Sequence, residues 1–237
     1  MSNTFYITTP IYYVNDKPHI GHAYTTILAD VLARYHRNIE KETFFLTGLD
    51  EHGQKVQQAA EKHGVEAQQH CDEMALRFTE LWEQLHISHD DFIRTTEERH
   101  KKVVRDILQQ VMDKGDIYEA EYEGLYSVSE ERFITEKEAE SGEFRDIKQL
   151  KEKNYFFKMS KYQQALIDHI KSNPKFIQPN NRKNEILGFL RQPLNDLCIS
   201  RPKSRLNWGI ELPFDSDYVT YVWFDALINY ITAPGFG

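Results

Sequence analysis

Residues 5–36 read FYITTPIYYVNDKPHIGHAYTTILADVLARYH, and this stretch decides the fold class. The run from Phe5 to Thr8 is short, apolar and β-branched, which predicts a buried strand. Pro10 and Pro18 then predict a loop. Apolar side chains recur at helical spacing beyond it, which predicts a helix from Ala23 to His36. A strand followed by a loop and an amphipathic helix is typical of a parallel α/β sheet.

The same alternation continues up to Gly115. The predicted elements are strands at Thr43–Thr47 and Phe92–Ile93 and helices at 54–62 and 66–85. Thr95 and Glu98 predict a capping box for one more helix, which ends at Gly115. The order of strands and helices predicts an α/β fold that begins with the first half of a Rossmann-like parallel sheet.

The pattern changes after Gly115. Residues 116–158 are rich in Tyr, Phe and Glu, and they predict short strands without a clear helix. Helices at 162–172 and 183–190 and a strand-like segment at 218–224 follow. We therefore divide the chain into three predicted parts. They are the first half of the sheet domain at 1–115, an inserted α+β connective domain at 116–217, and the start of the second half of the sheet domain at 218–237.

The composition limits the possible partners. The chain has 237 residues, of which 40% are hydrophobic, and its formal net charge is -8. Since a dedicated nucleic-acid module is usually basic, contact with nucleic acid must come from local patches or from sequence outside this chain. The distant pair Cys71 and Cys198 excludes a zinc site built from a cysteine cluster. No signal peptide or membrane span is predicted, so we expect a cytoplasmic protein.

The segment Pro18-His19-Ile20-Gly21-His22 joins the first predicted strand to the first helix, where α/β sheets bind nucleotides. A helix N-terminus offers free N–H groups to a phosphate. His19 and His22 can each donate a hydrogen bond to a phosphoryl oxygen, more strongly if protonated. Gly21 permits close approach of a base or phosphate, because it has no Cβ. The alternative for this short motif is two ordinary histidines at a helix start.

Further segments fit the same sheet pattern. They are residues 5–15, Gly48-Leu49-Asp50-Glu51-His52-Gly53, Asp90-Asp91-Phe92-Ile93-Arg94-Thr95-Thr96 and Tyr221-Val222-Trp223-Phe224-Asp225-Ala226-Leu227. Together with His19–His22, they resemble class I aminoacyl-tRNA synthetases, specifically the methionyl-tRNA synthetase family. His19–His22 matches the HIGH signature of that family at all four positions. The resemblance extends over essentially the whole chain and implies that 1–115 and 218–237 belong to a nucleotide-binding catalytic domain.

The resemblance implies a ligase reaction in two steps. The carboxylate of methionine attacks the α-phosphorus of ATP, pyrophosphate leaves, and the methionyl group then moves from AMP to a ribose hydroxyl of tRNA(Met). The implied cofactors are ATP and Mg²⁺. The implied partners are methionine, ATP and tRNA(Met), the last bound mainly through a carboxyl-terminal region outside this chain, and no membrane is expected.

The resemblance also assigns roles to residues. His19 and His22 are catalytic and bind the phosphates of ATP, with Gly21 near the adenine. Asp50 binds the α-ammonium of methionine, although a carboxylate that starts a helix is the bland alternative. The methionine side chain is enclosed by Ile11, Tyr13, Trp223, Ala226, Leu227 and Tyr230. The last four have helical spacing, so an ordinary core stripe is the alternative for them.

Two features depart from the family pattern. Many members carry Cys-x-x-Cys where this chain has Ser127 and Glu130, so we expect no zinc. Lys158-Met159-Ser160-Lys161 resembles the start of the second signature, KMSKS, but it lies within the insertion, so we interpret its lysines as solvated charges at a helix start. Because the true signature and the anticodon-binding helices lie outside this chain, we expect residues 1–237 to be a fragment that forms methionyl-adenylate poorly by itself.

Other interpretations remain for the chain. One is another class I synthetase, against which the segment from Trp223 to Tyr230 argues. A second is a binding module without catalysis, which a KMSKS signature further along the gene would contradict. The face made by His100, Lys101, Lys102 and Arg105 suggests RNA contact or, in the simpler interpretation, a solvated helix face.

Overall fold

The computed structural model describes residues 3–127, 132–134, 136–142 and 144–236. Two compact units are present. The first contains residues up to 109 and from 201 onward, and the second contains residues 110–200. Residues 201–217, which the sequence analysis assigns to the insertion, lie in the first unit. The three predicted parts stay an interpretation of the domain organisation.

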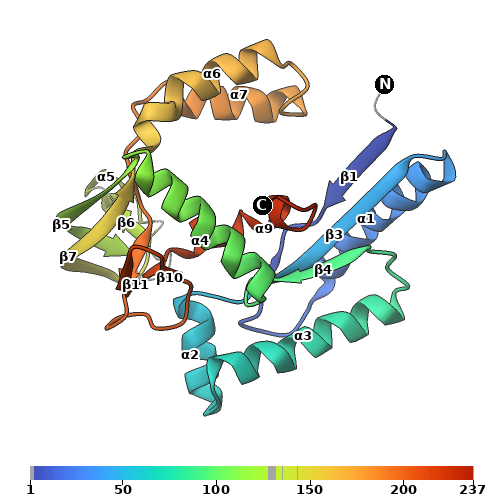
Figure 1. Cartoon of the computed structure of the whole chain (residues 1–237), viewed down its shortest axis with the longest axis horizontal. Helices are drawn as coiled ribbons and strands as arrows, with labels where there is room; N and C mark the ends of the chain where they lie inside the picture. Colours follow the sequence, from blue (N-terminus) through green and yellow to red (C-terminus); the bar gives the residue numbers. More distant parts are fainter. Residues whose placement is uncertain (1–2, 128–131, 135, 143, 237) are drawn as a thin grey trace. The chain divides into compact units, whose positions relative to one another are not determined.

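The first unit contains the parallel sheet that the sequence predicts, but the loop predicted from Pro10 to Pro18 is wrong at Tyr12–Tyr13, which form a short strand of that sheet. Its strands are β1 (Thr4–Thr8), β2 (Tyr12–Tyr13), β3 (Glu42–Asp50) and β4 (Asp91–Arg94). β3 is central and pairs in parallel with the other three, and Figure 1 shows β1, β3 and β4 running side by side. A Cβ at Gly48 would lie 2.1 Å from the Ile93 carbonyl oxygen, so the close approach of β4 to β3 requires glycine there. The predicted α/β fold class is confirmed.

The helices of this unit follow the predicted order. They are α1 (Ile20–Asn38), α2 (Gln54–His63), α3 (Ala67–Gln84) and α4 (Glu98–Asp113). α1 starts three residues before its predicted beginning, because His19 caps it. The predicted capping box of α4 is wrong. The hydroxyl of Thr95 accepts a hydrogen bond from the Glu51 N–H at 3.0 Å, and the helix begins only at Glu98.

The core of the unit is formed mainly by α3 and the sheet. Phe78 and Trp82 of α3 pack with Leu49 of β3 in one buried cluster. α1 contributes small residues instead, since Ala29 and Ala33 pack against Phe45. The large apolar side chains whose spacing predicts α1 are exposed. They are Ile27, Leu28, Val31, Leu32 and Tyr35.

The last segment of the first unit differs from its prediction. β9 (Ser200–Pro202), β10 (Glu211–Leu212) and β11 (Asp215–Thr220) form a separate three-stranded sheet, followed by α8 (Val222–Ala226) and α9 (Asn229–Thr232). The strand expected at 218–224 is wrong beyond Thr220. β11 pairs antiparallel with β10 and does not join the parallel sheet, and α8 begins at Val222.

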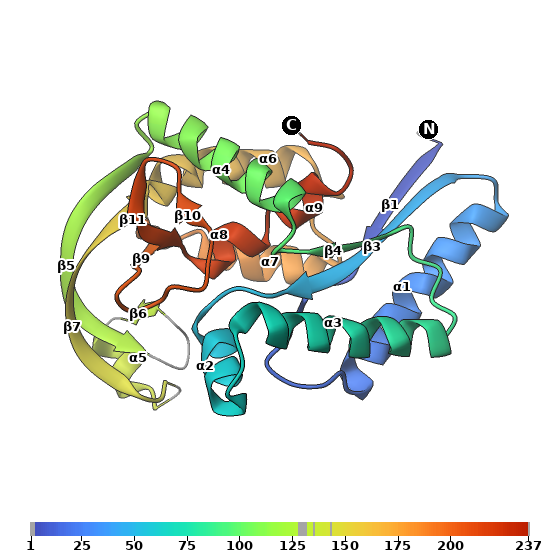
Figure 2. The ribbon, with the colours of Figure 1, turned by 60° about the horizontal axis from the view of Figure 1, so that its bottom comes forward.

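The second unit is built on a long antiparallel ribbon. β5 (Ile117–Ser127) and β7 (Ile147–Phe157) pair over their whole length, with β6 (Arg132–Ile134) beside β5 and β8 (Leu197–Cys198) beside β7. Figure 2 shows the two long strands bending together. The other elements are α5 (Glu136–Glu140), η1 (Met159–Tyr162), α6 (Gln163–Ser172) and α7 (Asn180–Phe189).

The prediction of short strands without a helix at 116–158 is therefore wrong. Opposite charges face each other across the ribbon, with Lys153 Nζ 2.5 Å from Glu119 and Lys151 Nζ 3.5 Å from Glu121. Cross-strand pairs of this kind support long strands in a sequence that is locally too polar to predict them. Among the described residues, no helix is long and apolar enough to cross a membrane.

Candidate active site

Two imidazoles lie together at the N-terminus of α1. The Nδ1 atom of His19 accepts a hydrogen bond from the Gly21 N–H at 3.0 Å, and the Nδ1 atom of His22 accepts one from the His19 N–H at 3.2 Å. The two rings stack with their centroids 3.8 Å apart. Both side chains therefore satisfy N–H groups at the start of the helix, in a reciprocal capping arrangement.

This capping arrangement determines which ring nitrogen carries the proton. A nitrogen that accepts an N–H bond must present its lone pair, so each ring carries its proton on Nε2. Burial, together with the neighbouring His19, holds the pKa of His22 below its usual value. His22 is therefore neutral at pH 7 and still offers an Nε2–H donor.

Gly21 is required by the position of the His19 ring. A Cβ at residue 21 would lie 2.8 Å from His19 Cε1 and 3.0 Å from its Nδ1 atom. Any other residue would push the imidazole out of the cap. The glycine of the motif thus has a local role in addition to the access to a ligand that the sequence suggests.

The ring of Tyr12 packs against the ring of His22 at the start of α1. Its ring centroid lies 4.6 Å from that of His22, and its hydroxyl is 2.8 Å from the hydroxyl of Thr26. Phe78 of α3 adds a second aromatic contact, with its centroid 5.3 Å from His22. Sequence reasoning missed Tyr12, although alternation along the extended segment places it on the opposite face from Ile11.

Asp50 ends β3 and is 3% exposed. The parallel register sets it beside Tyr13 of β2, so two residues predicted to contact the same ligand are neighbours. α2 begins later, at Gln54, with Gly53 as its N-cap, and the alternative of a helix-starting carboxylate does not apply. A buried carboxylate at this sheet edge suits a small cationic group.

The side chain of Glu51 is held by hydrogen bonds within the protein. Its buried carboxylate accepts a hydrogen bond from Arg94 Nε at 2.7 Å and another from the hydroxyl of Thr96. Burial raises the pKa of Glu51, and the charge of Arg94 opposes that shift. Arg94 also binds Asp72 at 2.6 Å. These contacts fasten the ends of β3 and β4 to α3.

A second buried carboxylate, Asp225, lies between two histidines. His52 Nδ1 is 2.6 Å from one of its oxygens, and His100 Nε2 is 2.7 Å from the other. Burial by itself would raise the pKa of Asp225, but both imidazoles act against it and hold the pKa below its usual value.

His100 is 0% exposed, so the interpretation of it as part of a solvated or RNA-binding face is wrong. Asp225 joins elements that are far apart in the chain, since His52 follows β3 and His100 lies in α4. Sequence reasoning missed this group, because no local pattern links these three positions.

The residues predicted to enclose a side chain divide into two groups. Trp223 in α8 and Leu227, the C-cap residue of that helix, are 48% and 56% exposed, so they are not core residues in this structure. Ala226 is buried. Tyr230 is near Ile11, whose N–H lies 3.4 Å from the Tyr230 hydroxyl. The fold thus brings Ile11 to Tyr230 from opposite ends of the chain, and it sets Tyr13 beside Asp50 on neighbouring strands.

The fold and these residues agree with a family comparison. The model of the family "tRNA synthetases class I (M)" matches residues 5–143 and 139–236. The chain belongs to this family. Its parallel sheet is accordingly that of a class I tRNA synthetase.

The relatives of this class I synthetase are also similar over its whole length. It is 52% identical to the methionine–tRNA ligase of Fusobacterium nucleatum over 241 residues, covering 100% of this chain and 38% of the relative. It is 49% identical to that of Rickettsia bellii, covering 100% of this chain and 47% of the relative.

A solved structure gives the same result. Mycobacterium tuberculosis methionyl-tRNA synthetase in complex with methionyl-adenylate has a TM-score of 0.92 and 41% identity, covering 100% of this chain and 47% of that one. The chain therefore spans less than half the length of these relatives.

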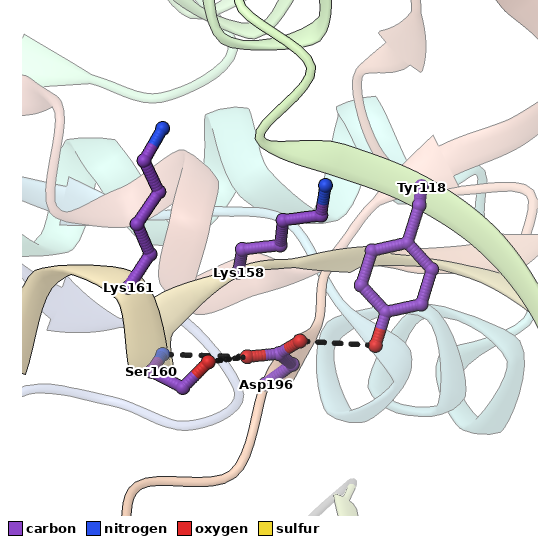
Figure 3. A pocket seen from close by; sticks show the side chains of 5 residues that line it. All are labelled: Tyr118, Lys158, Ser160, Lys161 and Asp196. Atoms are coloured by element: carbon purple, nitrogen blue, oxygen red, sulfur yellow. Dashed lines mark hydrogen bonds between the residues drawn. The ribbon is translucent and has the colours of Figure 1, made fainter.

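Lys158 and Lys161 of the synthetase both have partners within the second unit. Lys161 Nζ lies 2.6 Å from Asp116, and Lys158 Nζ donates to the Gly115 carbonyl at 2.7 Å. Both lysines line an open pocket of about 500 Å³. Figure 3 shows them with the other lining residues, Tyr118, Ser160 and Asp196. Asp196 accepts hydrogen bonds from the hydroxyls of Ser160 at 2.6 Å and Tyr118 at 3.0 Å. A carboxylate therefore shares the pocket with the lysines.

The positions of the missing cysteine pair are only partly described. Ser127 ends β5, and its hydroxyl donates to the Arg145 carbonyl at 3.2 Å, while Glu130 lies outside the described residues. Within the described ranges, no group of three or more His, Cys, Asp or Glu side chains is arranged to hold a metal ion.

Proposed function

We propose that this chain carries the methionine- and ATP-binding part of a methionine–tRNA ligase. The observation that carries the proposal is the arrangement of opposite chemistries on one parallel sheet. Two Nε2–H donors stand at the N-terminus of α1, and the buried carboxylate of Asp50 ends the neighbouring strand β3. The first suits a triphosphate, and the second suits an amino group.

In the proposed reaction, a carboxylate oxygen of methionine attacks the α-phosphorus of ATP. The bond from that phosphorus to the bridging oxygen breaks, pyrophosphate leaves with its electron pair, and methionyl-adenylate forms. A ribose hydroxyl of tRNA(Met) then displaces AMP from the methionyl carbonyl. No side chain becomes covalently attached, so the protein contributes positioning and charge stabilisation.

His19 and His22 are proposed to bind the phosphates. Each has its Nδ1 atom occupied by the backbone, so its Nε2–H is fixed in direction before ATP arrives. Donors that need no reorganisation stabilise the charge that moves onto the leaving phosphates. Gly21, at the same turn, is proposed to lie near the adenine.

Magnesium is proposed to arrive with ATP. The described residues hold no cluster of three acidic or imidazole ligands, and Mg²⁺ commonly binds through one or two carboxylates, waters and substrate phosphates. When bound, it neutralises part of the triphosphate charge.

Methionine is proposed to bind between the sheet edge and α8. Asp50 pairs with its ammonium group, and the neighbouring Tyr13 belongs to the wall. Ile11 and Tyr230, which the fold brings together, enclose the thioether with Trp223, Ala226 and Leu227. Contacts of sulfur with aromatic rings contribute about 0.3–1.5 kcal/mol each.

Exchange of pyrophosphate into ATP by the complete gene product tests this proposal. Methionine should support exchange better than any other amino acid, and a different preferred amino acid would contradict the choice of substrate. Asp50→Ala should raise the methionine KM much more than the ATP KM. The substituted site leaves an ammonium ion without its counter-charge, a loss of about 2–5 kcal/mol.

The matched control is Asp106→Ala, which removes an exposed carboxylate from α4. It should change neither KM. An Asp50→Ala protein with an unchanged methionine KM would remove Asp50 from the amino-acid site.

A further inference from the structure

Within the part of the chain that the structure describes, His52, Asp225 and His100 form a buried ionisable cluster that the proposed reaction leaves without a role. Asp225 and His100 are 0% exposed, and His52 is 3% exposed. A carboxylate removed from water destabilises a protein unless hydrogen bonds or charges compensate, and apolar residues of similar volume often give equal or greater stability. Stability alone is therefore a weak reason for this group.

The hydrogen bonds within the group have one consistent assignment. The carboxylate only accepts, so His52 donates from Nδ1 and His100 donates from Nε2. The other nitrogen of His100, Nδ1, is buried and has no hydrogen-bond partner among the residues that the structure describes. The orientation of both rings is thus determined by Asp225.

The location of the group is more informative than its chemistry. His52 is two residues after Asp50, and Asp225 stands on α8 between Trp223 and Ala226. On the outer side of His52, Trp208 packs with its ring centroid 5.5 Å away and donates its indole N–H to the Glu51 carbonyl. The segment that follows β3 is therefore in contact with Asp225 through His52 and with Trp208 through Glu51 and His52.

We infer that His52, Asp225 and His100 are positioning residues that fix α8 against the end of β3. In this way they set the distance between Asp50, which pairs with the ammonium group of methionine, and the residues of α8 that enclose its side chain. This inference rests on the proposed function. A displacement of about 1 Å in such a site can cost about a hundredfold in rate.

Amide substitutions test the inference because the two histidines use different nitrogens. Glutamine places its NH₂ near the position of Nε2, and asparagine places it near that of Nδ1. His100→Gln therefore keeps the donor to Asp225, and His100→Asn misplaces it. At position 52, His52→Asn keeps the donor and His52→Gln misplaces it. All four variants replace an imidazole by a neutral amide. A comparison of the two variants at one position therefore separates the position of the donor from the loss of the ring.

The methionine KM in steady-state pyrophosphate exchange should depend on the amide in opposite ways at the two positions, which we call a crossed pattern. His100→Asn and His52→Gln should raise the methionine KM by about tenfold and leave the ATP KM within about twofold. His100→Gln and His52→Asn should stay within about threefold of the wild type for both constants. The melting temperatures of the four variants give the temperature range in which all of them are folded, and the KM values are measured within it. Asp225→Asn provides a further variant if a histidine variant does not fold, and it should also raise the methionine KM selectively.

The outcomes separate this inference from the proposed function. A wild type that exchanges pyrophosphate with methionine, together with uncrossed or unchanged methionine KM values, would overturn the inference alone. Equal increases in both KM values would also overturn it, since a general structural role produces them. A wild type whose exchange depends on a different amino acid would overturn the proposed function and this inference together.

Discussion

Pro18–His22 and Lys158–Lys161 both place two basic residues at the start of a helix, but their surroundings differ. The histidines of the first segment bind only backbone N–H groups through Nδ1, and each keeps an Nε2–H donor. In the second segment, Lys161 is paired with Asp116 and Lys158 with the Gly115 carbonyl. Formal charge alone therefore does not distinguish the two segments. They differ in whether their donors already have acidic or carbonyl partners.

The two segments also differ in how tightly they are built. His22 rests on Tyr12 and Phe78, and Gly21 leaves room for the ring of His19. The lysines extend over an open pocket whose acidic residue, Asp196, would repel a phosphate. The following predictions test this difference, beginning with the largest expected effect.

Removal of the histidines should have the largest effect. His19→Ala and His22→Ala in the complete gene product should each lower the rate of adenylate formation by about 100- to 1,000-fold, as loss of a preorganised donor does elsewhere. ATP binding in the ground state should weaken less, because the phosphate charge grows toward the transition state. Stopped-flow measurement separates the two constants. Weaker ATP binding with an unaltered forward rate would contradict the assignment.

Gly21→Ala should give a smaller loss of activity. The added Cβ lies 2.8 Å from His19 Cε1, so the ring must leave its cap. We expect the rate of adenylate formation to fall about tenfold. Alanine is a better helix former than glycine by about 0.5–1 kcal/mol, so the melting temperature should not fall with the activity. A parallel decrease in both would indicate general damage to α1.

Loss of the lysines should barely affect catalysis. Lys158→Ala with Lys161→Ala should leave adenylate formation within about twofold of the wild type, since these side chains already have partners. The melting temperature should fall by a few degrees, because the 3% exposed side chain of Asp116 loses its cation. Asp196→Asn is a matched change in the same pocket and should also leave catalysis intact. Abolished exchange in the double variant would identify this segment as the catalytic loop.

The pH dependence of stability should show the smallest effect. The pKa of His22 is lower in the folded chain than in the unfolded chain, so the unfolded chain binds more protons as the pH falls below about 6.5. Folding should lose stability in that direction. The melting temperature of His22→Gln should decrease less than that of the wild type between about pH 7.5 and 5.5. Equal slopes would show that the ring of His22 titrates as it does in water.

Three strands of the parallel sheet could be predicted because their signals are local, while the two-residue strand β2 lies in a segment predicted as a loop. The runs Phe5–Thr8, Thr43–Thr47 and Phe92–Ile93 can each be recognised within a few residues. Their convergence follows from the rule that parallel strands share one functional edge. The family resemblance suggested Trp223 and Leu227 as residues that contact a ligand, and helical spacing alone would have assigned both to a core.

The remaining features depend on distant pairing. The eleven-residue strands β5 and β7 are stabilised by charges on opposite strands, such as Glu119 and Lys153, which a local window cannot match. The partnership of His100 with Asp225 spans 125 residues, so the helix pattern of α4 indicates only a polar residue. Thr95 fits a capping sequence, but its hydroxyl is used by the Glu51 N–H.

The long separation of Asp225 from its histidines has a consequence for synthesis on the ribosome. Another 125 residues must be made after His100 before Asp225 exists, and bacterial and eukaryotic ribosomes need about 6–25 s for that length at about 5–20 residues per second. During this interval, β3 and α4 can form, but their buried contact with α8 through Asp225 cannot. The nascent chain can thus form its parallel sheet early, whereas the contact that fixes α8 forms late.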